Sequence, residues 1–173
     1  MKRIIIFTGI PLLLIIIFLF IYQFPEKISV VRTAVAFNDR NPDSLKNTSI
    51  NIEGTIYRPL FRQHIFKGSI KIRGIEKTEN YETLNTEVLK RKNGINMGNL
   101  IYNKTHNNPP QHANMLGIIW FDDSFLNISV LGTDMENNQN EAIYIATGGT
   151  YEEGISTLRK MRDNYGSGFI NFE

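Results

Sequence analysis

An alternation of apolar and polar side chains with a period of two residues constrains the fold more than any other feature. Ile50, Ile52 and Ile56 alternate with polar residues, and a second run through Ile70 and Ile72 repeats the pattern. This is the period of a β-strand with one buried face. The intervening segment RPLFRQH fits a hairpin connection, so residues 48–74 are the clearest predicted β unit.

Further strands and turns follow the same logic. ISVVRTAVAFN is rich in β-branched residues and predicts a strand that the turn-forming cluster DRNPD ends near Asn38. Asn93-Gly94 joins TEVLKRK to INMGNLIYN and suits the positive φ angles of a type I′ hairpin turn. MLGIIWF and FLNISVLG flank Asp122-Asp123-Ser124 and predict a third hairpin, and AIYIATG predicts one more strand.

A helix signal follows the last strand. Thr150 and Glu153 form a capping box, and Ile155, Leu158 and Met161 make one apolar stripe before a glycine. We therefore expect a mainly β fold, an antiparallel sandwich or open barrel with one C-terminal helix covering an edge or face.

The N-terminal segment is strongly apolar. Ile4–Tyr22 contains 19 residues without a charge, and a helix of that length spans about 28 Å. We expect a transmembrane helix, with residues 1–25 as a membrane anchor and residues 26–173 as one β-rich domain. The alternative is a cleaved secretory signal, but its apolar core would be about 7–15 residues long and would end in an A-x-A-like site, whereas this one ends in QFPEK.

Charge around the apolar segment bears on its orientation. Lys2 and Arg3 precede it, and Lys27, Arg32 and Arg40 follow it, so the two flanks nearly balance. A short basic start before a first apolar segment is typical of export. We expect a single-pass protein of the cell membrane, with its N-terminus cytoplasmic and its C-terminal domain extracytoplasmic.

The net charge excludes one class of function. The formal charge of +2 comes from the two basic residues before the apolar segment, and residues 26–173 hold equal numbers of basic and acidic side chains. Nucleic-acid binders normally carry a basic excess, so we expect no nucleic-acid partner. The absence of cysteine excludes disulfides, thiol catalysis and Cys-based zinc sites.

Basic residues concentrate in the first part of the domain, where residues 26–73 carry nine basic and four acidic side chains. Lys67, Lys71 and Arg73 share one face of a predicted strand, and Arg58 and Arg62 lie nearby in the sequence. These five residues are candidates for contact with anionic headgroups or an anionic envelope polymer. The alternative is a solvated outer face that protects a sheet edge from pairing.

Histidine and aspartate offer few candidates for catalysis or metal binding. His106 and His112 bracket an irregular loop at residues 105–114 without the spacing of a metal site, and His64 has no partner in the sequence. Asp122 and Asp123 are adjacent, which suits a turn better than a pair of acid and base catalysts.

Two other segments resemble ligand loops only in part. Residues 134–141 have the oxygen-rich rhythm of a calcium loop, but Gln139 and Ile145 stand where glycine and glutamate are needed. Gly148-Gly149 precedes the predicted helix but lacks the remaining residues of a phosphate loop. We therefore predict no catalytic residues, no cofactor and no metal.

The stretch IEGTIYRPLFRQHIFKGSIKIRG, from Ile52 to Gly74, follows a basic start and an Ile-rich apolar segment. Together they resemble small, uncharacterised single-pass membrane-anchored proteins of low-GC Gram-positive bacteria. The resemblance implies a bacterial membrane location and implies no catalytic residue or ligand.

These observations favour a membrane-anchored, extracytoplasmic binding or interaction module that contacts a protein or envelope polymer through its sheet face or its 105–114 loop. Two alternatives remain. One is a small accessory subunit of a membrane complex that acts through its transmembrane helix. The other is an envelope hydrolase that uses Asp122, Asp123 or the loop histidines.

Overall fold

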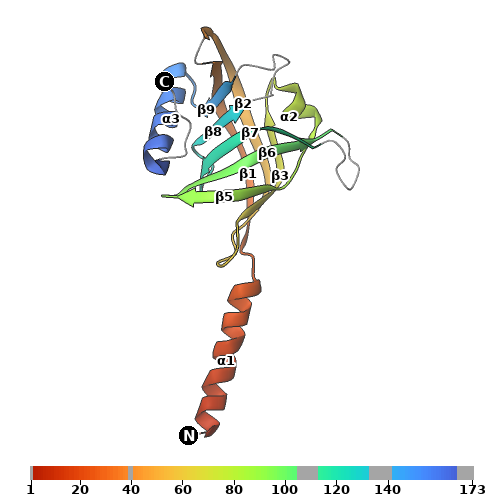
Figure 1. The fold of residues 1–173 in the computed structure, drawn as a ribbon, viewed down its shortest axis with the longest axis vertical. Helices are drawn as coiled ribbons and strands as arrows, with labels where there is room; N and C mark the ends of the chain where they lie inside the picture. Colours follow the sequence, from red (N-terminus) through yellow and green to blue (C-terminus); the bar gives the residue numbers. More distant parts are fainter. Residues whose placement is uncertain (1, 39–40, 105–112, 133–141, 167–173) are drawn as a thin grey trace.

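The computed structural model describes residues 2–38, 41–104, 113–132 and 142–166, which form a β-barrel with a helix on its outside and another at its N-terminus (Figure 1). The strands are β1 (Pro25–Asn38), β2 (Asn41–Tyr57), β3 (Ile65–Ile72), β4 (Glu82–Thr83), β5 (Thr86–Lys92), β6 (Ile95–Asn103), β7 (Ala113–Asp122), β8 (Ile128–Gly132) and β9 (Ile143–Thr147). The helices are α1 (Lys2–Ile21), α2 (Glu76–Asn80) and α3 (Tyr151–Tyr165).

Eight strands form a closed antiparallel barrel in which chain order is also spatial order. β1, β2, β3, β5, β6, β7, β8 and β9 pair successively, β9 returns to β1, and β4 lies beside β6. The expected sandwich or open barrel is therefore wrong, because the Ala34–Thr147 pairing joins the first strand to the last. The predictions of a mainly β fold and a C-terminal helix are confirmed.

The predicted transmembrane anchor is also wrong. A span requires about 20 consecutive, predominantly apolar residues. Among the described residues, no helix combines the length and the apolar character needed to cross a membrane. This finding overturns the single-pass assignment of residues 4–22.

Side chains fill the barrel. An eight-stranded barrel is just wide enough for inward-facing residues to pack against each other. The core residues that are at most 1% exposed include Ile50, Ile52, Ile56, Phe66, Ile70, Ile72, Leu100, Tyr102, Leu116, Ile119, Phe121, Ile128, Val130 and Ile145. Gly54 of β2 pairs with Gly68 of β3, and a Cβ on Gly68 would lie 2.5 Å from Gly54 Cα, so these strands approach closely here only because both residues lack side chains.

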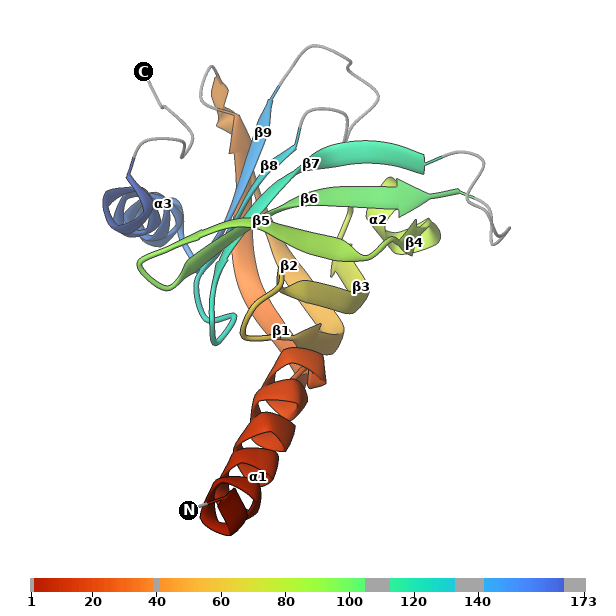
Figure 2. The same cartoon turned by 60° about the horizontal axis from the view of Figure 1, so that its bottom comes forward.

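Helix α3 packs on the outer surface of the barrel. Its Leu158, Met161 and Tyr165 are buried in a second core together with Val35 and Trp120. Thr150 Oγ1 accepts a hydrogen bond from Glu153 N at 3.3 Å, which confirms the predicted N-cap. Figures 1 and 2 show α3 and β3 on opposite sides of the barrel, so the outer surface of β3 is free of this helix.

Hydroxyl groups replace part of the ladder along β3. β3 pairs with β5 only at Ile65 and Phe66. Farther along, Thr83 Oγ1 accepts from Ile70 N at 3.0 Å, and Thr78 Oγ1 accepts from Ile72 N at 2.9 Å. α2 and β4 therefore close the barrel where β3 and β5 separate.

Candidate functional site

The outer surface formed by β1, β2 and β3 carries exposed cations on β1 and β3. The register places Lys27, Thr55 and Lys67 side by side on the three strands, and Val31, Asn51 and Lys71 form a second such row. Their side chains point outward because the alternate residues face the core. We call Lys27, Lys67, Lys71 and Arg73 the basic face.

Arg73 extends this surface beyond the end of β3. Its backbone N–H donates to Ser49 O at 2.9 Å, and its carbonyl accepts from Thr48 Oγ1 at 2.7 Å. These bonds continue the pairing of β3 with β2 by one residue. Arg73 is therefore held in the strand direction with an exposed side chain.

The basic face has little internal compensation of charge. Glu53 lies between Ser29 and Ser69 and is the carboxylate that the strand register places among these cations. Among the described residues, none of the four cations takes part in an ion pair. The Lys67 ammonium lies 5.2 Å from the centre of the Tyr57 ring, a cation–π contact that leaves its positive charge in place.

The five predicted anion-contact residues fall into two groups. Lys67, Lys71 and Arg73 lie on the basic face, as the alternation indicates. Arg62 donates instead to the Ile21 carbonyl at 3.1 Å, next to the end of α1. Arg58 forms an ion pair with Glu26 and donates to the Asp123 carbonyl. Lys27 was missed because it stands one residue before the predicted strand, which begins at Ile28, whereas β1 begins at Pro25.

A second polar cluster closes the end of the barrel from which α1 leaves. Arg91 forms an ion pair with the Asp123 carboxylate at 2.5 Å, and Asn96 Nδ2 donates to it at 3.0 Å. Burial alone would raise the pKa of Asp123, but the hydrogen bonds from Arg91 and Asn96 outweigh it and hold that pKa below its ordinary value. Asp123 therefore acts as a fixed counter-ion for arginine.

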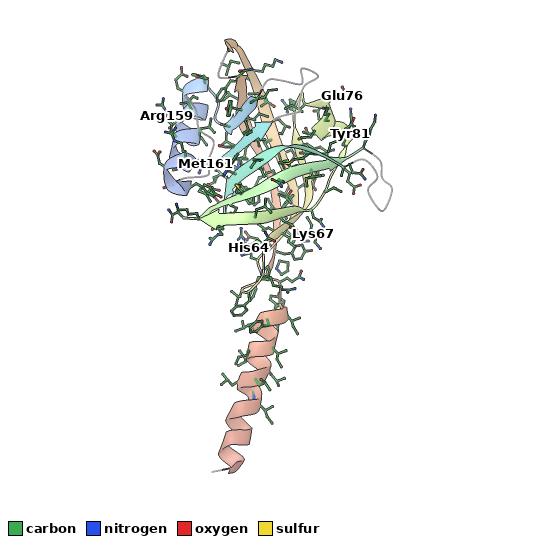
Figure 3. The ribbon with its side chains drawn as sticks, viewed as in Figure 1. His64, Lys67, Glu76, Tyr81, Arg159 and Met161 are labelled. Carbon is green, nitrogen blue, oxygen red and sulfur yellow. The ribbon has the colours of Figure 1, made fainter. Side chains whose placement is uncertain are left out.

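His64 lies near this cluster, since the charges of Arg91, Arg58 and Asp123 act on it, and Figure 3 shows it toward the end of the barrel from which α1 leaves. Burial lowers the pKa of His64, the Arg91 and Arg58 charges lower it further, and Asp123 opposes them. Within the described part of the chain, His64 Nδ1 and Arg58 Nε are buried without hydrogen-bond partners. Burial and the two guanidinium groups thus disfavour protonation of the imidazole.

Asp122 organises the β7–β8 turn. Its carboxylate accepts from the backbone N–H groups of Ser124, Leu126 and Asn127 and from the side chains of Ser124 and Asn127. Burial would raise its pKa, but these hydrogen bonds lower it. Asp122 and Asp123 are thus both held ionised by separate partners, an arrangement that suits a turn and not an acid and base pair.

The same turn inserts an aromatic plug into the barrel. Phe125 has a φ of 53° and is 1% exposed. Its ring stacks on Phe121 at 4.5 Å between centroids and lies 6.0 Å from Phe66. Arg32 Nε also donates to the Phe125 carbonyl at 2.9 Å, so the plug is fixed from outside as well as inside.

The remaining candidates carry less weight. His106, His112 and residues 134–141 lie outside the described residues. Gly149 N donates to Glu153 Oε2 at 2.6 Å, so this amide serves the helix entry instead of an anion. In the described part of the chain, no group of three or more His, Asp or Glu side chains could hold a metal ion.

Comparison with known proteins gives no family for this chain. No protein-family model, no curated protein and no solved structure matches it.

Proposed function

We propose that this protein is a binding module that holds an anionic polymer on its basic face. The observation that carries the proposal is the placement of Lys27 on β1 and of Lys67 and Lys71 on β3, which are exposed on one outer surface and, among the described residues, form no ion pairs. Strands fix the positions of these cations without a conformational change on binding.

The geometry suits an extended chain of negative charges. Lys67 and Lys71 are four residues apart on one strand, which corresponds to about 13 Å, and Lys27 and Lys67 are two strands apart, about 10 Å. A polymer with a charge every few ångströms can satisfy both intervals. A small anion could contact only one or two of the cations.

The expected affinity of one such patch is low. Each favourable contact near a charged surface contributes about 1 kcal/mol, so four contacts give about 4 kcal/mol, or a Kd of about 1 mM. A long polymer offers many overlapping binding registers and so a higher apparent affinity. Exposed charges are screened by salt, and binding should weaken markedly between low and physiological ionic strength.

Isothermal titration of the full chain with long-chain polyphosphate, and separately with poly-L-glutamate, tests the proposal. We expect the Lys67→Glu/Lys71→Glu variant to bind at least about tenfold more weakly, since two contacts of about 1 kcal/mol are lost and replaced by repulsion. The matched control is Arg159→Glu/Lys160→Glu, which makes the same charge change at exposed positions of α3.

The two variants separate a specific face from general charge. Retained binding in the α3 variant and lost binding in the β3 variant supports the proposal. Equal weakening would assign the effect to net charge and overturn it. Failure of the wild-type chain to bind either polymer at low salt would also overturn it. A difference between polyphosphate and polyglutamate identifies which anionic group is preferred.

A further inference from the structure

A pocket on the outer surface of the barrel lies beside the basic face but differs from it in chemistry. It has a volume of about 540 Å³ and lies where β4, β5 and β6 meet. Its apolar lining comes from Leu84, Leu89 and Ile101. Leu89 is 45% exposed, which is unusual for a leucine in the middle of a strand.

The backbone beside this pocket is an interrupted ladder. β5 pairs with β6 as far as Gly98, and β4 pairs with β6 from Tyr102. Between them, neither β4 nor β5 pairs with Asn99 or Leu100, and Leu84 N donates to Ile101 O at 2.8 Å. The interruption coincides with the pocket, because Asn99 and Ile101 also line it.

The charge of the pocket is acidic. Glu82 and Glu87 line it, and among the residues that the structure describes no lysine or arginine lines it. Glu87 is exposed on β5, next to the apolar side chain of Leu89 on the same strand face. A ligand that fits this lining combines a positive charge with an apolar group at a separation of one or two residues.

We propose that this pocket binds an extended basic segment of a partner protein. A lysine or arginine of the segment lies against Glu87, and a neighbouring apolar side chain contacts Leu84, Leu89 and Ile101. The segment lies extended along the pocket, beside the stretch of β6 at which its pairing with β4 and β5 is interrupted. This site is separate from the basic face and takes a ligand of opposite charge.

Fluorescence anisotropy with a labelled, acetylated peptide of alternating lysine and valine residues tests the site on the full chain. We expect saturable binding that Glu87→Lys weakens about tenfold or more. The matched control is Glu53→Lys, the same substitution at an exposed strand position on the basic face. It should leave peptide binding within about twofold of the wild type.

Two further probes decide between a peptide site and a general cation site. A peptide of alternating glutamate and valine should not bind, and spermine should compete only weakly because it lacks the apolar side chains. Equal effects of Glu87→Lys and Glu53→Lys, no binding of the basic peptide, or full competition by spermine would each overturn the proposal. Polymer binding by Glu87→Lys should persist, so failure here is distinguishable from failure of the proposed function.

Discussion

Replacement of Phe125 by alanine tests whether the β7–β8 turn closes the barrel through its aromatic plug. Phe125 is 1% exposed and stacks on Phe121 at 4.5 Å. A buried Phe→Ala change costs about 3–5 kcal/mol through lost burial and the cavity left behind. Both residues are L-amino acids at the same φ of 53°, so backbone strain cancels and the loss reports packing.

The free energy of unfolding can be measured by urea titration with the fluorescence of Trp120, the single tryptophan, which is 2% exposed. Thermal unfolding gives a second readout. For a domain of this size each kcal/mol shifts Tm by about 3 °C, so we expect the Tm of Phe125→Ala to be about 10–15 °C lower than that of the wild type. Leu126→Ala is the control, because Leu126 lies in the same turn but is 56% exposed. It should change stability by less than about 0.5 kcal/mol.

The reasoning fails if Phe125→Ala costs less than about 1 kcal/mol, or no more than Leu126→Ala. Either result would mean that the plug does not contribute to the core. An unchanged midpoint with a lower denaturant slope would instead indicate that the variant alters the compactness of one state, and the comparison of slopes separates the two cases.

Two further predictions concern polar groups. Thr78→Val keeps the shape of a fully buried side chain but removes the acceptor for Ile72 N. It should lower the free energy of unfolding by about 1–3 kcal/mol in the same urea assay. An unchanged free energy of unfolding would show that the hydroxyl is dispensable. Burial lowers the pKa of His64 below 6.5, so stability that requires neutral His64 is present above pH 6.5 and is lost as the pH falls through the folded-state pKa. The wild-type chain should lose more stability than His64→Gln between pH 7 and 5, and an imidazole titrating above 6.5 by NMR would contradict this.

Local features of the sequence predicted most of the strands correctly. Asn93 and Gly94 have φ values of 49° and 78°, as a type I′ turn requires, and they join β5 to β6. The alternation through Ile50 and Ile72 places these residues opposite each other in the core. These predictions succeed because turn chemistry and side-chain period depend on a few consecutive residues.

Features that depend on distant residues could not be predicted in this way. The pairing of Ala34 with Thr147 closes the barrel across more than 100 residues of chain, and no local pattern encodes it. Helix α2 was missed because it has only five residues, and its role rests on the hydroxyl of Thr78. β2 also begins at Asn41, earlier than the alternation indicates.

The candidate site was predicted in part for the same reason. Lys67, Lys71 and Arg73 share a strand face, which the period of two residues shows directly. Arg58 lies in the loop that precedes β3, but its side chain contacts Glu26 and the Asp123 carbonyl. These partners are 32 and 65 residues away in the sequence. A basic residue that is close in sequence to β3 therefore belongs to the basic face only if its side chain does not bind a carboxylate or carbonyl elsewhere in the fold.

The order of strands explains why the basic face and the acidic pocket can coexist on one small barrel. Residues 26–73 carry nine basic and four acidic side chains, and this segment forms β1, β2 and β3. In a barrel whose neighbouring strands are consecutive in the chain, an uneven distribution of charge along the sequence becomes an uneven distribution around the barrel. β5, with Glu87, follows β3 in the barrel, and in the chain only the short α2 and β4 lie between them. The two proposed partners, which are opposite in charge, therefore have binding surfaces on neighbouring sectors of the barrel that share no residue.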